Sequence, residues 1–218
     1  LGLDFLTKSL PEIGPEHLVF IRNLSGMGFL SVLIAVGASV LMTVIVHSSS
    51  ASTAIILTLA FKGMIDFNMA AAMILGANIG TTIDAFLASI TAKAMARRSA
   101  LVHILFNVIG SLIAIALFKP FVSFILWFTP GEAVGTGITT HLAMLHTMFN
   151  LFNTLLFLPF VNPIARLVTH VVKDDIESAA ARYKLVYATG SIQDTPELNV
   201  LRAEKEIRDM AGIVENMF

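Results

Sequence analysis

Three long stretches of the chain contain no Asp, Glu, Lys or Arg, and they limit the possible folds more than any other feature. They are residues 23–61, 99–118 and 133–165. Each reaches or exceeds the ~20 residues that an α-helix needs to cross the ~30 Å hydrocarbon core of a bilayer. Hydrophobic residues are 56% of the chain, charged residues are 13%, and the mean hydropathy is +0.82. We therefore expect an all-α polytopic membrane protein, with the lipid bilayer as its surroundings.

Composition also excludes several classes of function. The net charge is −1, so no basic surface for nucleic acid is expected. The chain has no cysteine, which excludes disulfides, iron–sulfur clusters and thiol catalysis. An intramembrane serine hydrolase is disfavoured because His47 and Ser48 are adjacent and no G-x-S-x-G turn is present. We expect neither an enzyme nor a resident cofactor.

Charge divides the chain into a membrane part and a tail. Sixteen of the 29 charged residues lie within 166–218. We predict a connecting, amphipathic segment at 1–25, a transmembrane part at 26–170, and a soluble helical tail at 171–218. Within the tail, Asp194 or Thr195 can cap a helix that starts at Pro196. This helix is either a solvated tail or a regulatory or docking module.

The basic residues predict how the membrane part is oriented. Lys93, Arg97 and Arg98 lie in one connector, and Arg166 and Lys173 follow the last apolar run, whereas residues 129–140 contain no Lys or Arg. We expect the protein to lie in the inner (plasma) membrane. The positive-inside rule then places the first connector and the tail on the cytoplasmic side. Two spans, at about 99–128 and 138–165, join these regions, and Pro120 can bend or end the first.

Two of the apolar segments are expected to be broken inside the membrane. Residues 26–61 would form a helix of about 54 Å at ~1.5 Å per residue, nearly twice the membrane core, so a division near "HSSSAST" (47–53) is expected. The segment 68–92 is interrupted by "GANIGTT" (76–82), whose glycines permit non-helical backbone. Irregular backbone at membrane depth is tolerated where it lines a cavity or binds a ligand, as in transporters.

The residues at these breaks suit two kinds of ion. A helix N-terminus exposes N–H groups and a partial positive charge, and nearby hydroxyls add donors for an oxyanion. Freed carbonyls, hydroxyls and the Asn78 amide are oxygen ligands suited to Na⁺. A single isolated serine in a membrane helix would more simply bond to the preceding turn or help helices pack.

These motifs resemble a known family. "HSSSAST", "GANIGTT", "ARRSALVHILFN" and "AMLHTMFN", in this order, are similar to the second half of bacterial sodium-dependent phosphate cotransporters of the type II Na⁺/phosphate family. The resemblance covers about residues 26–165. It implies two inverted repeats, each with a Q-S-S-S motif on a re-entrant or broken helix, with phosphate and sodium bound between them. The tail is similar to the start of the PhoU-like helical domain of many bacterial members.

The resemblance assigns candidate residues to each ion. Phosphate is expected at one set: His47, Ser48, Ser49, Ser50, Ser52 and Thr53. Sodium, as the coupling ion, is expected at another: Asn78, Thr81, Thr82 and Asp84. His47 stands where the family usually has Gln, and Asp84 where Thr or a similar residue is more usual. Asp84 is therefore either a cation ligand or an interface residue, and His47 can make binding pH-sensitive or shift ion preference.

Three further expectations follow. His103 and Asn107, like His146 and Asn150, are spaced i, i+4 and favour interhelical hydrogen bonds. The chain is expected to be one inverted-repeat half, completed by a missing N-terminal repeat of the same protein or by a second copy. The alternatives to sodium-driven phosphate transport are a sodium- or proton-coupled carrier of another small anion and a membrane sensor that signals through its tail.

Overall fold

The computed structural model describes residues 28–173 and 196–215, and the chain divides into two compact units at 173/174. In the described ranges all regular structure is helical, and four helical segments are long and apolar enough to cross a membrane. The prediction of an all-α polytopic membrane protein is confirmed. The predicted N-terminal segment 1–25 and the predicted caps Asp194 and Thr195 lie outside the described residues.

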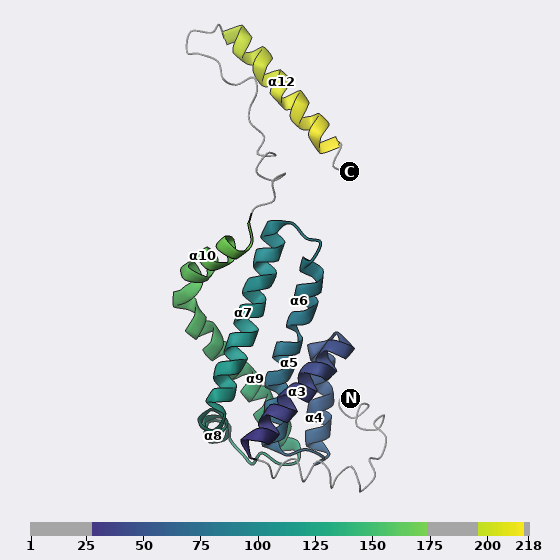
Figure 1. Cartoon of the computed structure of the whole chain (residues 1–218), viewed down its shortest axis with the longest axis vertical. Helices are drawn as coiled ribbons and strands as arrows, with labels where there is room; N and C mark the ends of the chain where they lie inside the picture. The colour runs from purple at the N-terminus through teal and green to yellow at the C-terminus, as the bar shows by residue number, and fades with distance from the viewer. Residues whose placement is uncertain (1–27, 174–195, 216–218) are drawn as a thin grey trace. The chain divides into compact units, whose positions relative to one another are not determined.

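The first unit contains eight α-helices and one 3-10 helix in its described part (Figure 1). In chain order they are α3 (Phe29–Val46), α4 (Ser49–Phe61), α5 (Phe67–Gly80), α6 (Thr82–Ser89), α7 (Ala94–Ala116), α8 (Phe118–Phe128), α9 (Thr136–Phe157), η1 (Leu158–Phe160) and α10 (Val161–Val171). The candidate spans are Phe29–Val46, Phe67–Ser89, Ala94–Ala116 and Thr136–Val171.

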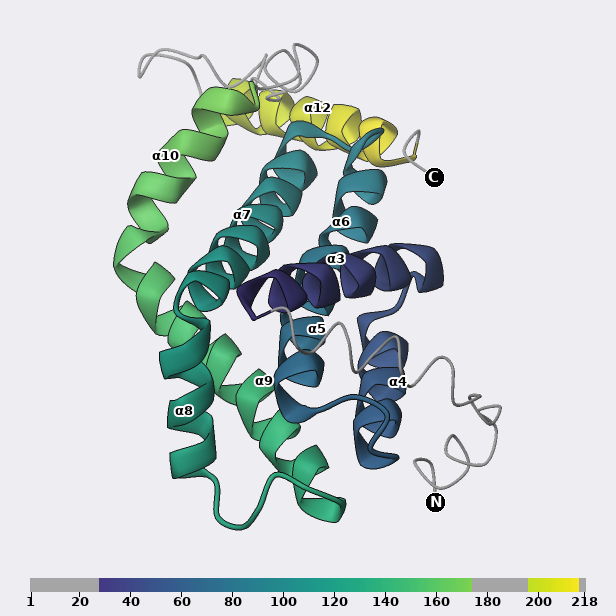
Figure 2. The same cartoon turned by 60° about the horizontal axis from the view of Figure 1, so that its bottom comes forward.

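The predicted division of the first apolar run is confirmed at His47 and Ser48. The amide of His47 donates to the Thr43 carbonyl at 2.9 Å, and His47 then takes a left-handed conformation with φ 53°. Ser48 is extended, which starts α4 in a new direction. In Figures 1 and 2 the end of α3 and the start of α4 meet at one corner and the two helices diverge from it. We call this corner, residues 47–50, the tip.

The predicted interruption at "GANIGTT" falls at Thr81, where α5 ends and α6 begins, but the prediction of non-helical backbone there is wrong. Gly76 and Gly80 lie inside α5, and Thr81, between α5 and α6, keeps right-handed helical angles of φ −58° and ψ −27°. The glycines serve close packing instead: a Cβ on Gly76 would lie 2.4 Å from the Val36 carbonyl oxygen. One on Gly80 would lie 2.6 Å from the Thr43 Cβ. The missing side chains let α3 lie directly against α5, as small residues do in membrane helix pairs.

The predicted effect of Pro120 is confirmed. Helix α7 ends at Ala116, the residue four before Pro120, and Leu117 leaves helical geometry before α8 starts at Phe118. Proline has no amide hydrogen and its ring clashes with the carbonyl of residue i−4, so a break here is expected. The span predicted at about 99–128 is therefore two helices, and α9 begins at Thr136, two residues before the predicted 138.

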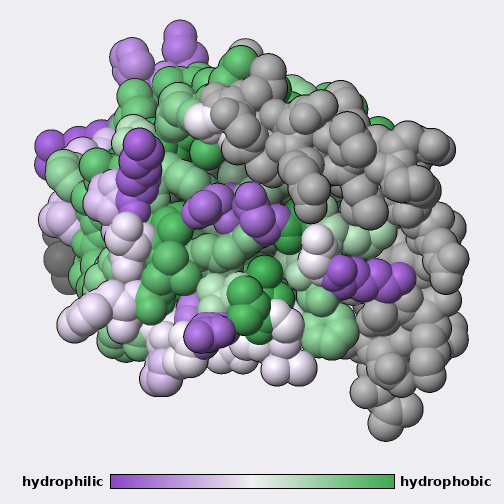
Figure 3. All heavy atoms as spheres, turned by 90° about the horizontal axis from the view of Figure 1, so that it is seen from below, coloured by the Kyte–Doolittle hydropathy of each residue, from purple (hydrophilic) through white to green (hydrophobic). Residues whose placement is uncertain are grey.

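The core of the first unit lies where α3, α4, α5, α8 and α9 meet. Its fully buried side chains include Ile56, Ile74, Leu75, Ile125 and Leu142. Many apolar side chains remain outside the core, such as Trp127, which is 80% exposed, and Ile45, which is 69% exposed. At the end of the bundle seen in Figure 3, hydrophilic side chains are mixed with apolar ones. Exposed apolar surface on this scale fits lipid or further protein as the surroundings.

The second unit contains α12, Pro196–Glu215. Its start at Pro196 confirms the predicted helix start. Arg208 donates to Glu204 at 2.7 Å, one turn earlier, so this pair lies on one helix face. The resemblance of the tail to a PhoU-like domain stays a prediction.

Candidate ion site at the tip of two helices

The serines of the tip divide into a capping residue and two residues that head the new helix. Ser48 is the N-cap of α4, and its Oγ accepts a hydrogen bond from the Ala51 amide at 3.2 Å. Ser49 and Ser50 are the first two residues of α4. No acidic residue lies in the first turn, so the partial positive charge of this helix end is not offset by its own residues.

Behind the tip, three hydroxyl oxygens are buried without a hydrogen-bond partner among the described residues. They are Ser39 and Thr43 on α3 and Ser52 on α4. Ser52 is fully buried one turn below the tip, whereas Thr53 is half-buried. Buried hydroxyls usually have a partner, so their unused bonding capacity marks a polar region inside an apolar bundle.

The two residues that the resemblance marks as unusual, His47 and Asp84, are in contact. His47 Nδ1 lies 2.7 Å from Asp84 Oδ1, and the side chains are 57% and 44% exposed. His47 is at the corner of α3 and α4, and Asp84 is in the first turn of α6. The contact brings the serine motif beside the junction of α5 and α6, although 37 residues separate the two positions.

The predicted sodium ligands around this junction have partners of their own. Thr81 donates to the Ala77 carbonyl at 2.8 Å and Thr82 to the Ile79 carbonyl at 2.7 Å. Asn78 Nδ2 donates to the Ile74 carbonyl at 3.2 Å, and Asn78 Oδ1 lies 3.2 Å from His146 Nε2. A donating hydroxyl keeps its oxygen lone pairs, and an amide oxygen can accept twice, so these oxygens retain capacity for a cation.

The predicted interhelical role of the His and Asn pairs is confirmed for His146, which reaches Asn78 on α5. Asn107 and Asn150 instead bond the carbonyls of His103 and His146 in their own helices, at 3.1 and 2.9 Å. For these two residues the prediction is wrong. Single polar residues in a helix can bond the carbonyl four residues earlier without any partner helix.

Sequence reasoning missed two other contacts between helices. Asn153 Nδ2 donates to the Phe106 carbonyl at 3.0 Å, and Gly110 leaves the room for this side chain. Ser111 donates to the Leu75 carbonyl at 3.3 Å. The sequence signal for such a contact is a small residue one helical turn after the accepting carbonyl. Gly110 stands in this relation to Phe106.

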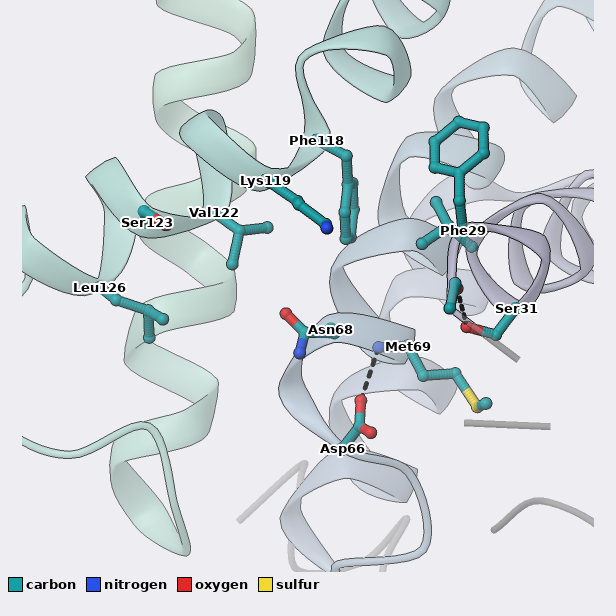
Figure 4. Close-up of a pocket in the computed structure, with 12 residues that line it drawn as sticks. Phe29, Ser31, Asp66, Asn68, Met69, Phe118, Lys119, Val122, Ser123 and Leu126 are labelled. Carbon is teal, nitrogen blue, oxygen red and sulfur yellow. Dashed lines mark hydrogen bonds between the residues drawn. The ribbon is translucent and has the colours of Figure 1, made fainter. Parts of the chain in front are cut away.

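A cavity of about 430 Å³ lies at the other end of α3 and contains none of the predicted site residues. The starts of α3 and α5 and helix α8 line it, and Figure 4 shows Lys119 and Asn68 pointing toward one another across it. The Asp66 carboxylate accepts from the Met69 amide at 2.8 Å as the cap of α5. Helix α3 separates this cavity from the tip by about 27 Å, at ~1.5 Å for each of its 18 residues.

Comparison with known proteins identifies the family. The profile of the family described as Na+/Pi-cotransporter matches residues 1–129, more than half of the chain. The chain belongs to this family. The family is one of transporters, not of enzymes, as the sequence predicts. No solved structure matches the chain.

Individual relatives agree with this membership. The chain is 32% identical over 219 residues to the Escherichia coli protein named "Putative inorganic phosphate export protein YjbB", covering 100% of this chain and 38% of that protein. It is 34% identical over 127 residues to YqeW of Bacillus subtilis, covering 58% and 39%. It is 39% identical over 90 residues to the mouse "Sodium-dependent phosphate transport protein 2C", covering 39% and 14%. The chain thus spans less than two fifths of the length of these relatives.

Proposed function

We propose that the protein to which this chain contributes moves inorganic phosphate across the membrane together with sodium ions. The observation that carries the proposal is the tip, where Ser49 and Ser50 head α4 next to its N-cap Ser48, beside the junction of α5 and α6. Family membership and relatives named for phosphate transport support phosphate as the substrate. The name of the mouse relative supports sodium as the coupling ion.

Phosphate is assigned to the N-terminal end of α4. The amides and hydroxyls of Ser49 and Ser50 can donate to its oxygens, while Ser48 holds the helix end in shape. No Lys or Arg lies in α3, α4, α5 or α6, so binding relies on dipoles and hydrogen bonds. Such a site avoids the cost of a fixed cation in the membrane and lets the anion leave again.

Sodium is assigned to oxygens around the α5–α6 junction. The hydroxyls of Thr81 and Thr82 and the amide oxygen of Asn78 are the candidates, held in place by their own hydrogen bonds. No group of three or more His, Asp or Glu suited to a metal ion occurs in the described ranges. Hard neutral oxygens suit Na⁺, which binds weakly and must exchange during each cycle.

We propose that the protein lies in the inner membrane with its tail in the cytoplasm, and the positions of the basic residues support this orientation. Arg98 on α7 donates to the Val172 carbonyl through Nε and Nη2, at 3.0 and 2.8 Å, so the basic connector and the end of α10 lie at one end of the first unit (Figure 1). The connector between α8 and α9, without Lys or Arg, lies at the opposite end. By the positive-inside rule the first of these ends is cytoplasmic.

A second face of the site is proposed to come from the rest of the protein. The relatives are more than twice as long as this chain, and the tip is half open, with His47 57% exposed. An upstream repeat is the preferred source, and a second copy of this chain is the alternative. Two faces that rock against one another would open the site to each side in turn.

The test is phosphate flux through the intact parent protein in proteoliposomes. Radiolabelled phosphate is supplied with a sodium gradient, with equal sodium on both sides, and with sulfate as a competing anion. We expect the sodium gradient to accelerate the flux of radiolabelled phosphate. We expect unlabelled phosphate, but not sulfate, to reduce this flux. Flux that depends on a proton gradient and not on sodium would reject sodium as the coupling ion. Stronger transport of sulfate than of phosphate would reject phosphate as the substrate.

A further inference from the structure

Hydrogen bonds join α7 at two points to residues 153–172, a segment that we call the arm. Arg98 donates to the Val172 carbonyl at 3.0 and 2.8 Å, and Asn153 donates to the Phe106 carbonyl at 3.0 Å. Residues 98 and 106 are about 12 Å apart along α7, whereas residues 153 to 172 would extend about 28 Å as one straight helix. The arm must therefore bow away from α7 between its two points of contact.

Two prolines account for the bow. Helix α9 ends at Phe157, and Pro159 lies in the 3-10 turn η1 that follows it. Pro163 lies in the first turn of α10. Proline lacks an amide hydrogen and its ring clashes with the preceding turn, so it bends a helical segment. Figures 1 and 2 show the arm curving away from α7 and returning to it at the end of α10.

The bow encloses a cavity of about 670 Å³ between α7 and the arm. Val102 and Phe106 line it from α7, and Phe157, Ile164 and Val168 line it from the arm. A second cavity of about 420 Å³ shares Phe157 and Ile164 with the first and is lined by apolar residues. The two cavities together form an apolar groove along α7, and their size is that of a ligand site.

The polar side chains of the larger cavity differ between its ends. Arg98, the exposed Ser99 and Thr169 lie near the contact with Val172. Thr154, near the other contact, donates its hydroxyl hydrogen to the Asn150 carbonyl at 2.8 Å within its own helix. Donors that can meet a ligand are thus expected at the Arg98 end.

The Arg98 end of the cavity is also basic. Helices α7, α9, η1 and α10 contain no Asp or Glu. Arg98 keeps its positive charge in its bonds to Val172, because the carbonyl is neutral. Arg166 adds a positive charge on α10, beside the lining residue Ala165. A cavity that is apolar along its walls and cationic at one end is complementary to an amphipathic anion.

The length of the cavity matches one leaflet of a bilayer. Its α7 wall runs from Met95 to Phe106, about 16 Å at ~1.5 Å per residue. One leaflet contributes about 15 Å to the ~30 Å hydrocarbon core. An acyl chain therefore fits along this wall with its headgroup at Arg98, whereas a free phosphate ion would leave the apolar walls uncovered.

We propose that the cavity between α7 and the arm binds a single anionic phospholipid of the cytoplasmic leaflet. Its phosphate lies at Arg98 and Ser99, and an acyl chain lies along the apolar walls. The planar guanidinium matches the geometry of a phosphate group, and basic pockets between membrane helices are typical sites for anionic headgroups. The choice of leaflet rests on the proposed orientation, but binding itself does not depend on which substrate the protein moves.

Lipid binding to the purified intact parent protein in detergent tests the proposal by native mass spectrometry. The probes are palmitoyl-oleoyl phosphatidylglycerol and palmitoyl-oleoyl phosphatidylcholine, which have the same acyl chains and differ in net charge. We expect a single phosphatidylglycerol to bind about tenfold more tightly than phosphatidylcholine, as expected for an anion near two arginines. Equal affinity for the two lipids would overturn the anionic site.

Two substitutions fill the cavity from opposite walls. Val102→Trp on α7 and Ala165→Trp on α10 should each weaken phosphatidylglycerol binding about tenfold, because the indole takes the space of the acyl chain. Leu112→Trp is the matched control, since Leu112 is a 56% exposed residue of α7 that lines neither cavity. It should bind as the parent does. Unchanged binding in both filled variants would place the lipid elsewhere and overturn the proposal.

Two substitutions of Arg98 separate its charge from its contact with Val172. Arg98→Lys and Arg98→Gln both lose the paired hydrogen bonds of the guanidinium, but lysine keeps the charge. The preference for phosphatidylglycerol should persist in Arg98→Lys and shrink severalfold in Arg98→Gln. Lys119→Gln, on α8 at the other end of the bundle, should leave the preference unchanged. Equal loss in both Arg98 variants would overturn the headgroup site.

The same experiment distinguishes a protein occupant from a lipid. If another part of the parent protein covers the cavity, Val102→Trp and Ala165→Trp should lower its unfolding temperature while phosphatidylglycerol binding stays as in the parent, which would overturn the proposal. Phosphatidylglycerol binding that responds to these substitutions in a protein without sodium-driven phosphate flux would keep the lipid site and reject the proposed function.

Discussion

The substitution Gly76→Ala should destabilise the first unit, although alanine is the better helix former. Its Cβ would lie 2.4 Å from the Val36 carbonyl oxygen, and contacts under 3.0 Å are essentially never seen, so α3 must move away from α5 by at least half an ångström. Overpacking of this kind costs about 1–3 kcal/mol. The helix propensity of alanine returns about 1 kcal/mol. The net loss of unfolding free energy is thus up to about 2 kcal/mol.

The assay is thermal unfolding of the intact protein in detergent, with Gly37→Ala as the matched control. Gly37 lies in α3 and a Cβ there would meet nothing within 4 Å, so this variant should be neutral or stabilised by up to ~1 kcal/mol. Gly76→Ala should unfold at a lower temperature than both the parent and the control. Equal unfolding temperatures for Gly76→Ala and Gly37→Ala would refute the close contact of α3 with α5.

Three further outcomes are expected. Ser49→Ala and Ser50→Ala should each weaken phosphate binding by about 1.5–3 kcal/mol, the scale of a hydrogen bond to a charged group; unchanged affinity in both would remove these hydroxyls from the site. Asn78→Ala and Thr81→Ala should shift the sodium dependence of flux at least as much as its phosphate dependence, and sodium titrations that match the parent would defeat that assignment. The 218-residue chain reconstituted alone should show no sodium-driven phosphate uptake, and co-expression with an upstream repeat should restore it. Robust uptake by the chain as a monomer would contradict the need for a second face. Uptake by a dimer would identify a second copy as that face.

Features that depend on length and on local chemistry could be predicted from the sequence. The run from 26 to 61 is too long for one span, so a division near residues 47–53 follows, and the structure places it at His47 and Ser48. Pro120 similarly predicts the end of α7, because its ring excludes the carbonyl geometry of a continuing helix.

Features that depend on the neighbouring helix could not be predicted. Glycine permits both an unwound backbone and a close helix contact, and only the position of α3 decides that Gly76 and Gly80 serve the second. His47 and Asp84 could each be recognised as unusual, but their pairing requires the approach of α6 to the tip. The i, i+4 spacing of His and Asn likewise does not say which amide turns toward another helix.

The bond from Arg98 to the Val172 carbonyl has a practical consequence for protein engineering. It fastens the last turn of α10 to the start of α7, and the first compact unit ends one residue later, at Lys173. A shortened chain that stops after Lys173 keeps these hydrogen bonds between Arg98 and Val172, whereas one that stops before Val172 loses them. Residue 173 is accordingly the place to cut, or to join a reporter protein, if the membrane unit is to be purified with its helices in register.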